Sequence, residues 1–72
     1  MRIEAQVTGI VVDVSIAVGE TIKVGDTLMV IESMKMHYPL DALMAGDVTE
    51  ILVGPKDTVE EGQVVIVLDG ER

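Results

Sequence analysis

Residues 8–32 read TGIVVDVSIAVGETIKVGDTLMVIE, and residues 45–69 read AGDVTEILVGPKDTVEEGQVVIVLD. Sliding the first stretch by 37 positions lays it on the second without a gap. The identical residues in this alignment include Gly9 on Gly46, Val11 on Val48, Thr21 on Thr58, Gly25 on Gly62 and Val30 on Val67. Two copies of one structural unit therefore make up most of the chain.

Each copy has the pattern of short strands, rich in Val, Ile and Thr and punctuated by glycine. Near the start of the first copy, apolar and polar residues alternate with a period of two, which is typical of a half-buried strand. We expect the inward side chains to be Ile10, Val12, Val14 and Ile16, and in the second copy Ile51 and Val53 beside Thr49.

The remaining apolar stretches also indicate strands. Ile3, Ala5 and Val7 alternate with polar residues, and residues 64–68 (VVIVL) are apolar on both faces, which predicts an interior strand. No stretch repeats its apolar residues at helical spacing. The sequence predicts an all-β domain over residues 1–72, in which the two copies pair about a pseudo-two-fold axis and close one core between two small sheets.

Composition excludes several classes of function. The 13 acidic residues against 5 basic ones give a net charge of −8, which disfavours nucleic acid, and a single tyrosine leaves almost no platform for base stacking. There is no cysteine for a disulfide or a cysteine-ligated metal site. No apolar run is long enough to span a membrane, and the first residues lack the apolar core of a signal peptide. We therefore expect a cytoplasmic protein.

Residues 33–44 (SMKMHYPLDALM) belong to neither copy. Strands expected at residues 28–33 and about 37–43 leave very few residues between them, which predicts a tight hairpin with Lys35 at or beside its tip. Pro39 cannot donate a hydrogen bond to a neighbouring strand, so its strand should lie at a sheet edge or be irregular.

An exposed lysine at a hairpin tip is usually a solvated charge, but Lys35 has methionine on both sides. Methionine is flexible and polarizable, which suits a surface that docks into another protein. Met34 and Met36 have an equally good alternative role, in which they cover the end of the barrel. A lone His37 is more simply a solvated residue than a catalyst or a metal ligand.

The stretch Glu32-Ser33-Met34-Lys35-Met36 resembles the Met-Lys-Met attachment motif of biotin carboxyl carrier domains. The resemblance extends over essentially the whole chain, including the repeat, the lysine between its copies and Gly46 at the usual distance from the motif. Ser33 stands where the family often has alanine, and His37 where it often has a polar residue such as glutamate.

The resemblance implies a flattened β-barrel (a barrel-sandwich hybrid) of two four-stranded antiparallel sheets, with the lysine on the exposed turn. It also implies that biotin protein ligase attaches biotin to the ε-amine of Lys35. Met34 and Met36 would serve in recognition by the ligase, and Glu32 and Ser33 would complete the motif. The ammonium form of lysine is not nucleophilic, so the ligase must help to remove its proton.

In such a carrier, biotin shuttles carboxylate, as carboxybiotin, between a biotin carboxylase and a carboxyltransferase. The domain itself would then supply no catalytic residue and no metal. We expect it to be monomeric in isolation. The gapless alignment of the two copies leaves no room for the thumb loop that some bacterial carriers have. The carboxyl acceptor, and whether the domain stands alone or within a larger protein, are left open by the sequence.

Three alternatives remain at this point. A lipoyl domain, or one that accepts both groups, shares the fold but usually shows Asp-Lys-Ala at the tip. An unmodified interaction module could use the same barrel. An enzyme in its own right is the weakest alternative, because the carboxylates of Glu32, Asp41 and Asp69 are scattered in the sequence. If Lys35 were not the attachment site, Lys23 and Lys56 would be the remaining lysines.

Overall fold

The computed structural model describes residues 1–70, and within this range all regular structure is β. The strands are β1 (Arg2–Glu4), β2 (Gly9–Val14), β3 (Thr21–Ile22), β4 (Thr27–Ser33), β5 (Met36–Asp41), β6 (Gly46–Ile51), β7 (Thr58–Val59) and β8 (Val64–Gly70). A helix that could cross a membrane is absent from this range.

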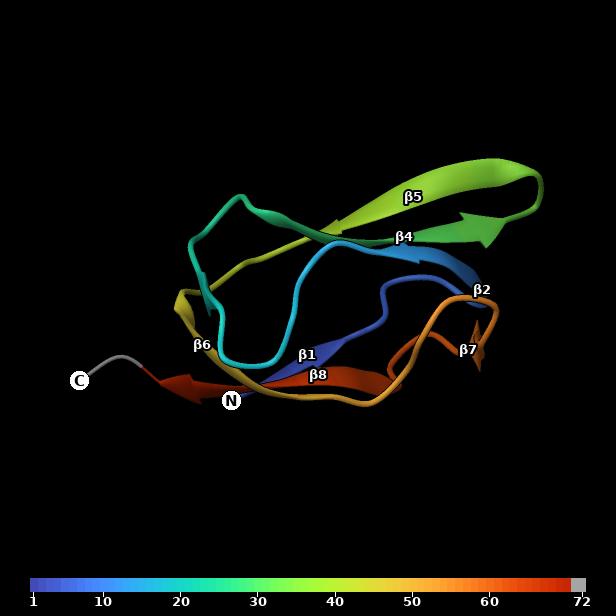
Figure 1. Ribbon diagram of the computed structural model, residues 1–72. Coiled ribbons are helices and arrows are strands. Elements are labelled where there is room, and N and C mark those ends of the chain that lie inside the picture. Colours follow the sequence, from blue (N-terminus) through green and yellow to red (C-terminus); the bar gives the residue numbers. More distant parts are fainter. Residues whose placement is uncertain (71–72) are drawn as a thin grey trace.

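The strands form two four-stranded sheets, in the orders β1-β8-β6-β3 and β5-β4-β2-β7, and all pairs are antiparallel. The sheets face each other across the core (Figure 1). Each sheet takes two strands from each half of the chain, so neither half can close its apolar face alone. The expected all-β barrel of two sheets is confirmed. Strand β8 is interior and β5 is an edge, as residues 64–68 and Pro39 predicted.

The sequence repeat is also a repeat of hydrogen bonds. The Gly19 amide donates to the Val48 carbonyl oxygen at 2.8 Å, and the Lys56 amide donates to the Val11 carbonyl oxygen at 2.7 Å. Gly19 and Lys56 are equivalent positions, and both have positive φ, 93° and 77°. These paired turns carry the chain from one sheet to the other, which is why the two halves interlock about the pseudo-two-fold axis.

The inward stripe expected on β2 is wrong in its first half. Val11 is fully buried, whereas Ile10 and Val12 are exposed, and Val14 and Ile16 pack against the core as expected. The cause is a break in register, because Val11 pairs with Ile31 but Asp13 pairs with Val30. The extra residue is a β-bulge, which reverses the face on which the following side chains lie.

The second copy contains the same irregularity in β6, between Val48 and Glu50. Val48 is therefore buried, while Thr49 is exposed and donates its hydroxyl to the Val67 carbonyl oxygen at 3.0 Å. The expectation that Thr49 lies on the inward stripe is wrong, and those for Val53, which is buried, and Ile51, which packs against the core, are confirmed.

The core is entirely apolar among the described residues, with no buried polar or charged side chain. Its buried members are Ile3, Ala5, Val11, Ile22, Leu28, Met29, Ile31, Leu40, Ala42, Val48, Val53, Val59, Val65, Ile66 and Leu68. Two glycines allow strands to approach closely at equivalent positions. A Cβ atom on Gly46 would lie 2.6 Å from the Asp69 carbonyl oxygen, and one on Gly9 would overlap the Glu32 carbonyl oxygen.

The molecule is elongated, with extents of 39 × 20 × 19 Å. The hairpin of β4 and β5 projects from one end, and the N-terminus lies toward the other end, beside β8 (Figure 1). The Met1 ammonium group donates to the Leu68 carbonyl oxygen at 2.7 Å, which fixes the N-terminus on β8. The tip of the hairpin is thus held away from the point where the chain begins.

Candidate attachment site

Met34 and Lys35 form the two-residue turn that joins β4 to β5. Both have positive φ, 52° and 65°, as in the type I′ turn that suits the twist of paired strands. Ser33 and Met36 face each other as the last strand pair before the turn. Lys35 is exposed at the tip of a tight hairpin, and this predicted position is confirmed.

The choice of residues in this turn does not favour stability. Type I′ turns favour Asn-Gly, because positive φ is easily adopted by glycine and asparagine. A non-glycine residue in this region costs on the order of 1 kcal/mol. The sequence Met34-Lys35 therefore has a reason other than turn formation.

The tip projects beyond its supporting strand. β2 pairs with β4 only as far as Ile10 opposite Glu32, so Ser33 has no partner on that side. Glu32 and Ser33 are half-buried where the hairpin leaves the body of the protein. Within residues 1–70 the Lys35 ammonium group has neither a hydrogen bond nor an ion pair. An enzyme active site can therefore close over Lys35 without displacing another contact.

The methionines beside Lys35 are uncovered. Met34 is 92% exposed and Met36 is 60% exposed, so the alternative in which they cover the barrel end is wrong. Tyr38, which the sequence did not single out, belongs with them, because its hydroxyl lies 3.8 Å from the Met36 Sδ atom. The sequence did hold a signal for Tyr38, because alternate residues of a strand lie on the same face. Met36, Tyr38 and the buried Leu40 are such alternate residues of β5.

The other two lysines occupy braced turns. Lys56 lies between Pro55 and Asp57, and the Asp57 carboxylate accepts the Gly54 amide at 2.7 Å. Lys23 lies in the other turn of its own copy, where its amide donates to the Asp26 carboxylate at 2.8 Å. Neither lysine stands on a projecting hairpin, and neither is flanked by methionine.

The site offers one exposed primary amine on a short, projecting hairpin with apolar neighbours. These features fit a covalently attached group such as biotin, because attachment needs an accessible amine and a surface that a modifying enzyme can grip. His37 is exposed on the same strand, and no group of His, Asp and Glu side chains among residues 1–70 could hold a metal ion. The arrangement suits a carried group better than catalysis by the chain itself.

Comparisons with known proteins agree with this geometry. A family described as "Biotin-requiring enzyme" matches residues 1–68. The biotinylated protein TB7.3 homolog of Mycobacterium leprae is 33% identical over 66 residues, covering 92% of this chain and 93% of that protein. The biotin carboxyl carrier protein of acetyl-CoA carboxylase from Streptococcus pyogenes is 45% identical over 51 residues, covering 71% of this chain and 31% of that protein.

Among solved structures, the urea carboxylase of Kluyveromyces lactis matches with a TM-score of 0.88 and 32% identity, over 96% of this chain and 6% of that one. A lipoyl-type relative also matches. It is the dihydrolipoyllysine-residue acetyltransferase component of pyruvate dehydrogenase complex from Mycoplasma pneumoniae, which is 39% identical over 61 residues. The match covers 85% of this chain and 15% of that protein. The chain thus spans only a small part of most of these proteins. With its fold, its projecting lysine and these relatives, the chain belongs to the biotinyl domain family of biotin-requiring enzymes.

Proposed function

We propose that the chain is a biotin carboxyl carrier domain, with biotin attached through an amide bond to the Nζ atom of Lys35. The observation that carries this proposal is the tip of the hairpin, where Met34 and Lys35 occupy a positive-φ turn and Met34 is 92% exposed. A biotin protein ligase would recognise this tip through Met34 and Met36, while Glu32 and Ser33 hold its base.

Bound biotin would supply a nitrogen that takes up carboxylate at one active site and releases it at another. The chain's own part is to present the group. While the domain is docked on an enzyme, the flexible stem of Lys35 would hold biotin near the active site at an effective concentration on the order of mM. We propose that a biotin carboxylase and a carboxyltransferase provide those sites, and that the domain itself supplies no catalytic group. The relatives that belong to carboxylases, in Streptococcus pyogenes and Kluyveromyces lactis, support this division of roles.

We propose that the domain acts in the cytoplasm, a compartment that would supply the ATP that a biotin carboxylase consumes. We propose that the domain is monomeric in isolation. One chain closes its own apolar core, and among the described residues no buried polar side chain lacks a hydrogen-bond partner.

A lipoyl carrier is the second candidate, and the Mycoplasma pneumoniae relative is the observation that favours it. Against it stands the tip, where methionine flanks the lysine on both sides in place of the Asp-Lys-Ala of lipoyl domains. The two groups differ in mass, so the intact mass of the chain distinguishes them.

The experiment is expression in a host that has both ligases, followed by intact-mass measurement. We expect one biotin adduct per chain and no lipoyl adduct. A single lipoyl adduct without biotin would contradict the proposal. A chain that stays unmodified with active ligase, ATP and biotin present would instead support the unmodified interaction module.

A further inference from the structure

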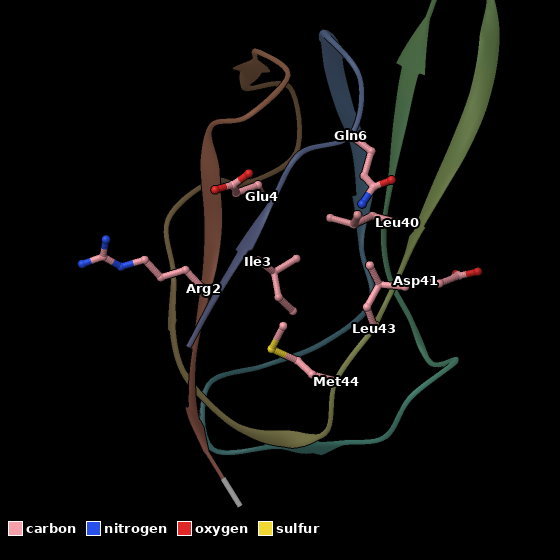
Figure 2. A pocket seen from close by; sticks show the side chains of 8 residues that line it. All are labelled: Arg2, Ile3, Glu4, Gln6, Leu40, Asp41, Leu43 and Met44. Atoms are coloured by element: carbon pink, nitrogen blue, oxygen red, sulfur yellow. The ribbon is translucent and has the colours of Figure 1, made fainter.

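Two adjoining hollows, of about 190 and 360 Å³, lie between β1 and the edge strand β5. The two share Gln6, Leu40, Asp41 and Leu43, and together they form what we call the β1–β5 groove. In Figure 2 the side chains of Ile3, Leu40, Leu43 and Met44 gather inside it, whereas those of Arg2, Glu4 and Asp41 point away. The groove is therefore apolar inside, and Gln6 extends toward Leu40 at one end of it (Figure 2).

An apolar track connects this groove to the attachment site. On β5, Met36, Tyr38 and Leu40 lie on one face, and their exposed fractions fall from 60% to 37% to 3% from the tip toward the core. Tyr38 lines the larger hollow and contacts Met36 through its hydroxyl group. Tyr38 is the only aromatic residue in the chain, and it stands between the tip and the groove.

The length of a biotinylated lysine matches this distance. Tyr38, on β5, is three residues beyond Lys35 in the turn, which corresponds to about 10 Å at ~3.3 Å per residue. From the lysine Cα atom to the biotin ring system there are about ten bonds of ~1.5 Å each. An arm folded back along β5 would therefore bring the rings past Tyr38 and into the groove.

The chemistry of the groove suits the rings as well. The biotin ureido group has N–H donors and a carbonyl acceptor, and the Gln6 carboxamide has the complementary acceptor and donors. That carboxamide has no hydrogen bond within the part of the chain that the structure describes. The sulfur-containing ring is apolar and would cover Tyr38 and Leu43, and Leu43 is 74% exposed without it.

We propose that the β1–β5 groove is a resting site for the biotin carried on Lys35 of the same chain, an inference that rests on the proposed function. The ureido group would bind the Gln6 carboxamide, and the sulfur-containing ring would lie against Tyr38 and Leu43. Because the tether gives an effective concentration on the order of mM, even an intrinsic Kd of about 1 mM gives roughly half occupancy. Such weak binding shields the rings from solvent and still releases them to an enzyme.

The test is NMR on apo protein and on protein whose complete biotinylation is established by intact mass. We expect nuclear Overhauser effects between the biotin rings and the Tyr38 ring, and a change in the Tyr38 ring resonances upon biotinylation. Leu43→Gln should abolish both signals. Val24→Gln, which changes a residue of similar exposure (67%) outside the groove, should keep them.

A fully biotinylated chain with unchanged Tyr38 resonances would overturn the resting site and leave the proposed function intact. Signals that persist in Leu43→Gln would also overturn it, as would changes that grow with protein concentration, because these would indicate a second copy in the groove. A chain that the ligase does not biotinylate would overturn the proposed function, and the resting site with it.

Discussion

At the scale of single residues, the site depends on side chains placed where the fold gains nothing from them. Met34 is almost fully exposed, and its backbone has a positive φ of 52°. An exposed apolar side chain in a strained position neither fills the core nor stabilises the turn. Under the proposed function, its role is contact with another protein, the ligase.

We accordingly expect Met34→Gln to lower kcat/KM for biotinylation by more than roughly fivefold, as for an apolar residue at the centre of an interface. The free energy of unfolding should change by less than about 0.5 kcal/mol, because Met34 has no packing to lose. Steady-state biotinylation and thermal unfolding measure the two effects. The control is Val18→Gln, an exposed residue in a loop of the first repeat, which should leave both unchanged; a ligase rate unaffected by Met34→Gln would contradict the role of Met34.

Gly9 is required for the opposite reason, since it allows a close approach. A methyl group there would overlap the carbonyl oxygen of Glu32, at the base of the hairpin. Gly9→Ala should therefore destabilise the domain by about 1–3 kcal/mol, which corresponds to a drop in Tm of about 4–8 °C per kcal/mol in a domain this small.

The equivalent change, Gly46→Ala, is the matched control. Its methyl group would lie 2.6 Å from the Asp69 carbonyl oxygen, at the position that the pseudo-two-fold axis relates to Gly9 and Glu32. We expect it to lower Tm as well but, at a temperature where both variants are folded, to leave the biotinylation rate closer to that of the parent than Gly9→Ala does. Equal rates in the two variants would mean that Gly9 does not position the hairpin.

At the scale of elements, the sequence predicted the strands and the hairpin because these follow from local patterns and from the repeat. It failed at β2, where alternation suggested that Ile10 and Val12 face inward, although Val11 does. A bulge inserts one residue into the strand, and nothing in the types of residue around it reveals the insertion. The inward positions predicted after the bulge are therefore correct, and those predicted before it lie on the wrong face. The β1–β5 groove was also not predictable, since Gln6 and Leu43 are far apart in the sequence and meet only where the edges of the two sheets lie next to each other.

The turn gives a prediction at this scale. Replacing both turn residues by those that the type I′ turn favours, Met34→Asn with Lys35→Gly, should raise the free energy of unfolding by about 1 kcal/mol and abolish modification. Thermal unfolding and intact mass measure these effects. The control places asparagine and glycine at the strand positions that flank the turn, as Ser33→Asn with Met36→Gly. This variant should not be more stable than the parent. A double turn variant less stable than the parent would show that Met34 and Lys35 stabilise the turn after all.

At the scale of the whole molecule, an elongated barrel holds the hairpin at one end and the N-terminus toward the other (Figure 1). The barrel carries 13 acidic and 5 basic residues, and amide formation at Lys35 would take the net charge from −8 to −9. An acidic carrier of this size should be drawn to basic docking faces on its partners.

Ionic strength tests this attraction. Between about 0.01 M and about 1 M salt, the screening length falls from ~30 Å to ~3 Å. We expect the association rate with the ligase to fall by roughly tenfold over this range. Stopped-flow measurement of the apo domain with ligase gives the rate directly, and a rate independent of salt would show that the acidic surface serves solubility alone.

The central claim is that Lys35, alone among the lysines, carries biotin. Lys35→Arg keeps the positive charge and removes only the acceptor amine, whereas Lys23→Arg and Lys56→Arg make the same change in the braced turns. Streptavidin detection after incubation with ligase, ATP and biotin should show no signal for Lys35→Arg and a full signal for the other two. Persistent labelling of Lys35→Arg would contradict the account, and loss of signal in Lys23→Arg or Lys56→Arg would then identify the lysine that carries biotin.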